Sequence, residues 1–232
     1  MKAFLFACLL LMGGASYAQS EANGSWILQR PSQDTVTILL IQDDYFSYTD
    51  YTPTAFLQTF GGTIKTTGQN MDVVFEFSSH DKDMIGATRN VPYRITGGML
   101  TLTLPEGELV FSRATEAAPN DLAGTWRITG RMVDNNMSEM KPGPRKTLKI
   151  LTGGRFQWIA MNTETKEFFG TGGGTYTFEN GKYTETITFF SRDNNRVGRN
   201  VQFDAKVDDG KWHHSGKSTA GDPMHEIWSR IK

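Results

Sequence analysis

Two adjacent histidines, His213 and His214, stand in the segment "KWHHSG" of this chain. Imidazoles can transfer protons or bind metal ions, so the pair is the first candidate for chemistry. In a regular strand, however, neighbouring side chains point to opposite faces. Trp212 shares a face with His214, and tryptophan prefers the interior. We therefore expect His214 to point inward and His213 to be solvated, so that the two histidines do not form one site.

Two glutamates are expected on the same inner wall. In "MHEIWSR" the alternation places Glu226 and Trp228 on one face, and in "KYTETITFF" it places Tyr183 and Glu185 on one face. Buried carboxylates need partners, because burying an unpaired charge is costly. A cluster of these acids with Tyr183 and His214 would be self-consistent. It is either a ligand site or a buried polar network that only satisfies itself.

Other kinds of chemistry have little support in the sequence. Cys8 is the only cysteine and lies in the expected signal peptide, which excludes disulfides and thiolate sites from the mature chain. There is no His-Glu-x-x-His segment and no Gly-x-Ser-x-Gly elbow. A metal site formed by His214, Glu185 and Glu226 is the weaker alternative. We assign no catalytic residue, no metal and no cofactor.

The N-terminal twenty residues, "MKAFLFACLLLMGGASYAQS", combine a basic start, a short apolar run and small residues before Gln19. This pattern predicts a signal peptide over residues 1–18, cleaved near Ala18, and export to the periplasm or the extracellular space. No apolar run is long enough to span a bilayer. Cleavage would remove Lys2 and no acid, leaving 23 basic and 25 acidic residues, a net charge of −2. Without a basic block, nucleic acid is not an expected partner.

The chain also contains an internal repeat. "GSWILQR" from Gly24 returns as "GTWRITGR" from Gly124, "TVTILLIQDDYFSY" from Thr35 resembles "KTLKILTGGRFQWI" from Lys146, and "TFGGTI" resembles "TGGGTY". The order is kept to the C-terminus, with offsets that drift only from 100 to 117 residues. Collinear matches of this kind indicate a tandem duplication. We expect halves at residues 21–115 and 123–232, with a linker at 116–122.

Each half has the pattern of about eight short antiparallel strands, with turn signals such as "ENG" and "DDG" between them. An all-β fold of two tandem eight-stranded up-and-down barrels is therefore expected, since closure removes exposed strand edges. Gly-x-Trp on a first strand with an arginine ending the last strand resembles lipocalin-like barrels. The pairs here are Trp26 with Arg113 and Trp126 with Arg230. The second half resembles bacterial secreted lipocalin-like domains without an assigned function.

The two halves differ in their inner walls. The first half has Val73 where the second has Glu185, Leu109 where it has Glu226, and the apolar "MLTLTL" in place of the histidine strand. The fold therefore does not require the polar residues. We expect a non-enzymatic binding protein for a small polar or amphiphilic ligand. The expected ligand-binding residues are Trp158, Tyr183, Glu185, His214, Glu226 and Trp228.

Two alternatives remain open. In one, the barrels are filled and serve as an interaction or structural module through outer faces or rims, which predicts no internal pocket. In the other alternative, the second half is a small-barrel enzyme using His214 and a glutamate, which predicts a solvent-open cavity with His214 within hydrogen-bond reach of a carboxylate. Tyr45, Tyr48 and Tyr51, in "DDYFSYTDY", are either rim packing or a sugar- or partner-binding surface.

Overall fold

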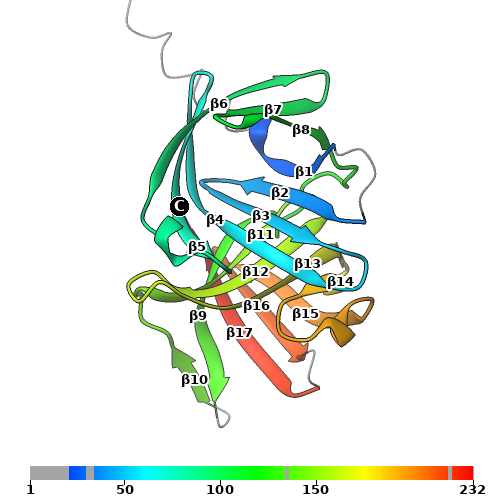
Figure 1. Cartoon of the computed structure of the whole chain (residues 1–232). Coiled ribbons are helices and arrows are strands. Elements are labelled where there is room, and N and C mark those ends of the chain that lie inside the picture. The colour runs from blue at the N-terminus through cyan, green and yellow to red at the C-terminus, as the bar shows by residue number, and fades with distance from the viewer. Residues whose placement is uncertain (1–20, 30–33, 134–135, 219–220, 232) are drawn as a thin grey trace, which may run out of the picture.

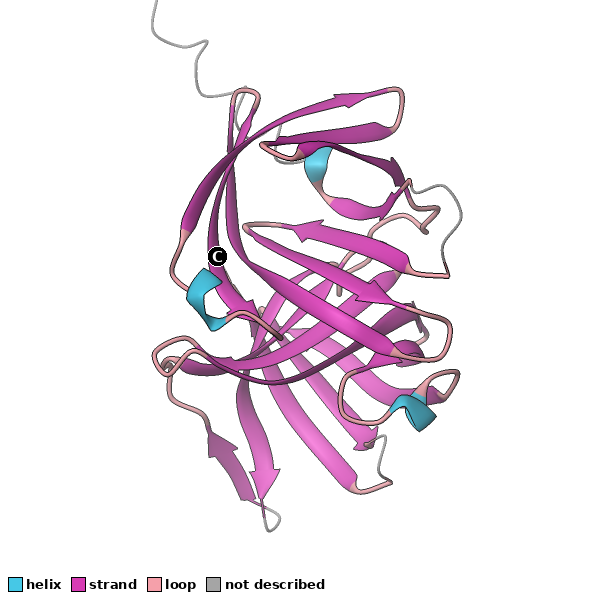
Figure 2. Cartoon of the chain, in the orientation of Figure 1, coloured by secondary structure: helices cyan, strands magenta, loops and turns pink. Residues whose placement is uncertain are grey.

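The structure is a computed structural model that describes residues 21–29, 34–133, 136–218 and 221–231. It consists of two closed eight-stranded antiparallel β-barrels in tandem, which confirms the predicted fold class (Figure 1). Among the described residues, strands dominate and the helical segments are short (Figure 2). The predicted signal peptide lies outside the described residues. Within them, no helix is both long and apolar enough to cross a membrane.

The first barrel is an uninterrupted meander in which each strand pairs with the next and the last pairs with the first. Its strands are β1 (Gly24–Leu28), β2 (Val36–Gln42), β3 (Tyr45–Tyr51), β4 (Phe56–Thr67), β5 (Asn70–Ser78), β6 (Thr88–Thr96), β7 (Met99–Leu104) and β8 (Gly107–Arg113). A single 3₁₀ turn, η1 (Lys82–Met84), connects β5 to β6.

The second barrel repeats this order and closes through the pairing of its last strand with its first. Its strands are β9 (Gly124–Val133), β11 (Arg145–Leu151), β12 (Arg155–Asn162), β13 (Glu167–Glu179), β14 (Lys182–Phe190), β15 (Asn200–Asp208), β16 (Lys211–Lys217) and β17 (Pro223–Arg230). The turn η2 (Asn194–Arg196) corresponds to η1. An additional strand, β10 (Asn136–Glu139), pairs only with β9 and extends from the barrel as a hairpin (Figure 1).

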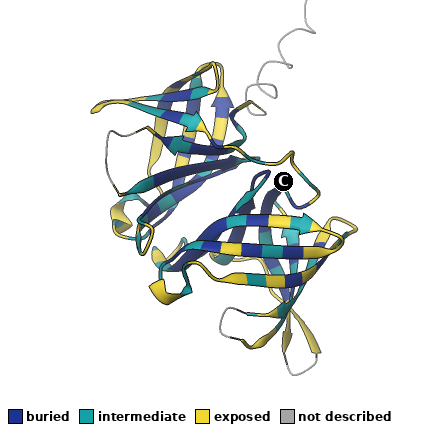
Figure 3. Cartoon of the chain, turned by 90° about the vertical axis from the view of Figure 1, so that its right-hand side faces the viewer, coloured by how far each residue is buried: buried dark blue, intermediate teal, exposed yellow. Residues whose placement is uncertain are grey.

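Buried and more exposed residues alternate along β5, β6, β14 and β15, as the sequence pattern predicts (Figure 3). By contrast, β2, β3 and most of β11 are buried on both faces. Glycine pairs in the long strands β4 and β13 allow the sheet to bend. The register shifts between Gly61 and Gly62 in the first barrel and between Gly173 and Gly174 in the second. A Cβ atom on Gly62 or Gly174 would collide with the backbone of the neighbouring strand. Only glycine fits these two bulges.

The floor of each barrel has the same construction. The guanidinium carbon of Arg113 lies 4.0 Å from the ring centroid of Trp26, and that of Arg230 lies 4.4 Å from the ring centroid of Trp126. Each arginine also donates hydrogen bonds to two backbone carbonyls of the segment before its barrel's first strand. Both pairs therefore close one end of a barrel, which is a structural role.

The two barrels pack against each other through outward-facing side chains of β2 to β5 and β11 to β14. These form one apolar cluster: Ile38, Leu40, Tyr45, Tyr51, Phe77, Leu148, Ile150, Ile159, Met161 and Phe189. Two of the three candidate tyrosines thus lie in the contact between the barrels, while Tyr48 stacks on Phe60 inside the first barrel, with ring centroids 4.6 Å apart. These tyrosines do not form a single exposed surface.

Polar contacts support this packing. The buried Gln157 accepts a hydrogen bond from Thr49 at 3.0 Å and donates to Thr59 at 3.1 Å, so one side chain of the second barrel bonds two of the first. Lys146 also reaches Glu76 of the first barrel at 2.8 Å. The barrels are therefore held in a defined arrangement by apolar burial and by matched polar groups.

Candidate functional site

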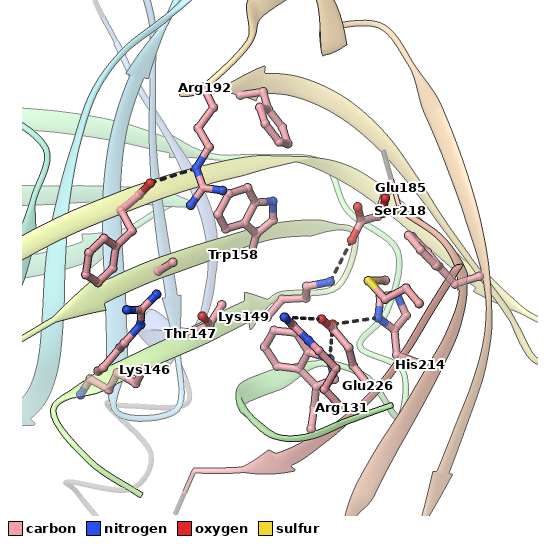
Figure 4. Close-up of a pocket in the computed structure, with 17 residues that line it drawn as sticks. Arg131, Lys146, Thr147, Lys149, Trp158, Glu185, Arg192, His214, Ser218 and Glu226 are labelled. Carbon is pink, nitrogen blue, oxygen red and sulfur yellow. Dashed lines mark hydrogen bonds and ion pairs between the residues drawn. The ribbon is translucent and has the colours of Figure 1, made fainter. Parts of the chain in front are cut away.

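The second barrel contains an open cavity of about 440 Å³ (Figure 4). The first barrel holds a smaller one, of about 130 Å³, whose wall is almost entirely apolar. The larger cavity lies at the end of the barrel opposite the floor formed by Trp126 and Arg230. A volume of this size is in the range of small-molecule sites. The filled-barrel alternative therefore does not describe the second barrel.

Five of the six expected ligand-binding residues line this cavity, namely Trp158, Glu185, His214, Glu226 and Trp228. The sixth, Tyr183, lies below it: its side chain is fully buried, and its ring packs 5.1 Å from Trp212 and 5.6 Å from His214. His214 is 1% exposed, whereas His213 on the opposite face of β16 is half-buried. The alternation of side chains therefore correctly separated the two histidines.

A buried ion pair lies at the centre of the cavity wall. Lys149 Nζ, on β11, is 2.9 Å from Glu185 Oε1, on β14, and both side chains are almost completely buried. The same Nζ lies 5.0 to 5.8 Å from four ring centroids: those of Phe156, Tyr183, Trp212 and Trp228. The carboxylate and the ring faces together stabilise the buried ammonium group.

Glu226 has partners of its own. Its Oε1 lies 3.1 Å from Arg131 Nη2, and its Oε2 accepts a hydrogen bond from Trp228 Nε1 at 3.2 Å. Burial opposes the charged form of Glu226, but His214, Lys149 and Arg131 outweigh burial, so its pKa lies below the ordinary value. Both predicted acids are therefore paired, as the cost of burying a charge requires.

His214 is a buried polar group that lacks hydrogen-bond partners in the described part of the chain. Its Nδ1 lies 3.7 Å from Glu226 Oε2, which is beyond hydrogen-bond distance. Neither ring nitrogen has a hydrogen-bond partner among the described residues. Burial first, and then the charge of Lys149, lower the pKa of His214 below its ordinary value, although Glu226 and Glu185 oppose this shift. The imidazole lines the cavity, and its two ring nitrogens, one donor and one acceptor, are buried without a hydrogen-bond partner in the described structure.

The strand registers show what occupies the same positions in the first barrel. Lys149 pairs with the floor tryptophan Trp126, as Leu39 pairs with Trp26. The same comparison aligns Glu185 with Val73, His214 with Leu102 and Glu226 with Leu109. We call Lys149, Glu185, His214 and Glu226 the polar quartet. Their four counterparts all line the apolar cavity of the first barrel.

Lys149 is the main residue that reasoning from the sequence missed. The repeat alignment that starts at Thr35 and Lys146 matches Lys149 with Ile38, an outward position, whereas the structure matches it with Leu39. This slip of one residue reverses the inner and outer faces. Anchoring the alignment on aromatic pairs, with Tyr48 matched to Trp158, gives the correct register.

One position of the second barrel has glycine where the first barrel has phenylalanine. Gly172 pairs with Trp158 where Phe60 pairs with Tyr48 in the first barrel. A Cβ atom on Gly172 would lie only 2.7 Å from Trp158 Nε1, so the indole occupies the space of the missing side chain. The described residues contain no group of three or more histidine, cysteine, aspartate or glutamate side chains placed to hold a metal ion.

Comparisons with known proteins give a family of unassigned function. Residues 121–232 match a family described as a domain of unknown function (DUF4488). No curated protein sequence matches the chain. One solved structure, the crystal structure of uncharacterized protein YLR301w from Saccharomyces cerevisiae, is 11% identical, with a TM-score of 0.46 over 90% of this chain and 96% of that chain. That likeness carries no argument. The match and the two barrels together support a β-barrel family of unassigned function.

Proposed function

We propose that the second barrel is a non-enzymatic binding site for a small polar or amphiphilic molecule. One observation carries this proposal: the polar quartet replaces four apolar residues that the first barrel uses at the same positions. A buried ion pair is weak as a stabilising device compared with well-packed apolar side chains. The quartet, around an open cavity, is therefore better explained by a bound molecule than by stability.

Binding is favoured over acid-base catalysis by the geometry of His214. The enzyme alternative predicts an open cavity, which is present, and a carboxylate within hydrogen-bond reach of this imidazole, whereas His214 Nδ1 lies 3.7 Å from Glu226 Oε2. The free ring nitrogens suit an uncharged polar group of a ligand, and the aromatic wall suits its apolar part.

We further infer that the protein is exported after cleavage near Ala18. The support is the basic, apolar and small-residue pattern of residues 1–18. Intact-mass measurement of the protein secreted by its host should give a chain that begins at Gln19. A mature protein that retains Met1 would contradict this inference.

The Glu226→Leu variant tests the binding site. Its partner Arg131 is half exposed, so removing the carboxylate leaves no buried unpaired charge and the fold should be kept. A native mass spectrum of wild-type protein purified without denaturation should show a bound small molecule that the variant lacks. Glu108→Leu, on the outside of the first barrel, is the matched control and should keep it. Equal occupancy of wild type and Glu226→Leu, or no bound species on either, would contradict the proposal.

A further inference from the structure

The cavity of the second barrel has an excess of positive charge. Its wall contains five cationic side chains and two carboxylates: Arg131, Arg145, Lys146, Lys149 and Arg192 against Glu185 and Glu226. Three of the cations are paired, with Glu226, with Glu76 of the first barrel and with Glu185 respectively. Arg145 and Arg192 have no carboxylate partner within the described part of the chain. The unpaired charge is therefore confined to two guanidinium groups.

These two arginines are held in place by the same residue of β13. The guanidinium carbon of Arg145 lies 4.6 Å from the ring centroid of Phe169, and Arg192 Nε donates a hydrogen bond of 2.9 Å to the carbonyl oxygen of Phe169. Arg192 also lies over Trp158, at 5.7 Å from the ring centroid (Figure 4). Stacked arginines are already ordered and keep NH groups free, which is the arrangement that recognises carboxylates and phosphates.

Elsewhere in the cavity, aromatic side chains line the wall beside the mutually neutralised Lys149 and Glu185. Trp158 and Phe190 meet edge to face, with centroids 5.5 Å apart, and Phe203 and His214 also line the pocket, with centroids 4.1 Å apart. The buried ring nitrogens of His214 have no hydrogen-bond partner among the described residues, and the two carboxylates nearby already have partners. This part of the wall suits an uncharged body, largely aromatic or apolar, that can carry a neutral polar group for His214, rather than a second anionic group.

The geometry points to a ligand with one anionic oxygen group, a carboxylate or a phosphate, bound at the mouth by Arg145 and Arg192, and with an aromatic or apolar body directed towards His214. This inference rests on the proposed function and specifies its ligand. The first barrel supplies a comparison within the chain. Its cavity has a single basic residue, Arg89, and otherwise apolar side chains.

Two fluorescent probes that differ by one charged group test the inference. 1-Anilinonaphthalene-8-sulfonate carries a sulfonate, and N-phenyl-1-naphthylamine is the same molecule without it. Both are titrated into the full-length protein and into the double variant Arg145→Gln, Arg192→Gln. Loss of charge-assisted hydrogen bonds should weaken sulfonate binding by about tenfold or more. Binding of the neutral probe should stay unchanged, which also shows that the variant is folded.

Controls separate this inference from the proposed function. Ala160 lines the cavity and is half-buried, so Ala160→Trp should block it and abolish binding of both probes. If Ala160→Trp leaves both probes bound, the cavity is not their site and the proposed function fails. If it abolishes both, but the arginine variant weakens the two probes equally, only the inference on charge is overturned. Arg94→Gln, on the outside of the first barrel, should change neither titration.

Displacement distinguishes the two anion classes. Phenyl phosphate, benzoate and benzyl alcohol share an aromatic ring and differ in their polar group. We expect the bound sulfonate probe to be displaced by at least one of the two anions and not by benzyl alcohol at equal concentration. Whichever of the two anions competes more strongly identifies the anionic group of the ligand as a phosphate or a carboxylate. Displacement by benzyl alcohol equal to that by both anions would overturn the inference.

Discussion

Lys149 is the residue on which the polar wall of the second barrel depends. Its ammonium group compensates Glu185, and its charge also acts on His214 and Glu226. Leu39 occupies the same place in the first barrel and needs no such compensation. The two barrels therefore allow a direct comparison of a buried ion pair with an apolar side chain at the same position of the same fold.

Replacing Lys149 alone should be strongly destabilising. Lys149→Leu leaves Glu185 buried without its cation, which costs about 3 to 5 kcal/mol in the free energy of unfolding. The double variant Lys149→Leu, Glu185→Val copies the first barrel and should recover most of that loss. Urea denaturation of wild type, both single variants and the double variant measures the coupling. Strictly additive effects would contradict the pairing.

His214 should make stability depend on pH in a defined direction. Its folded-state pKa is lowered by burial and by Lys149, against the opposing effects of Glu226 and Glu185. Protons therefore bind the unfolded chain first as pH falls below about 6.5, the ordinary histidine value. Below this pH, the free energy of unfolding of the wild type should fall relative to that of His214→Leu, by at most about 1.4 kcal/mol per pH unit. Above this pH, the difference between the two proteins should stay constant. Chemical denaturation at several pH values measures the difference, and a wild type that gains on acidification would refute it.

The strands position this chemistry through their registers and bulges. The alternation within β14, β16 and β17 determines which side chains face inward, and it was readable in the sequence. The bulges at Gly61-Gly62 and Gly173-Gly174 bend the long strands β4 and β13 at equivalent points of the two barrels. Both register shifts fall within the glycine runs of the repeated segments "TFGGTI" and "TGGGTY".

Alanine at these bulges should reveal how tightly the strands approach. Gly174→Ala would force a Cβ atom against the carbonyl of Thr186, and Gly62→Ala would do the same against Val74. Each change should lower the free energy of unfolding by more than about 1 kcal/mol. Gly143→Ala is the control, since nothing lies within 4 Å of its added atom. Thermal or urea unfolding gives the comparison, and equal stability of all three variants would rule out the close approach.

The whole chain behaves as two barrels with a shared apolar contact. The contact buries Leu148 and Ile150 of β11 against β2 and adjoining strands, and Gln157 satisfies two threonines across it. Glu116, between the barrels in sequence, accepts hydrogen bonds from Ser25 of the first barrel and Gly154 of the second. The two barrels are therefore packed against each other and are not independent domains joined by a flexible linker.

Unfolding should consequently be cooperative across both barrels. We expect a single transition in differential scanning calorimetry of the full chain, because separating the barrels exposes the shared cluster. The double variant Leu148→Asp, Ile150→Asp places charges in the contact and should split the transition into two. Two resolved transitions in the wild type would show that the contact does not couple the barrels.

The sequence by itself determined the β class, the duplication and the inward direction of His214, Glu185 and Glu226. These are local properties, since the period of two along a strand follows from backbone geometry alone. The pairing of Lys149 with Glu185, the unpartnered His214 and the open cavity were decided only by the tertiary structure. They depend on how separate strands are registered and on how neighbouring side chains fill space, and a shift of one residue between strands reverses the faces.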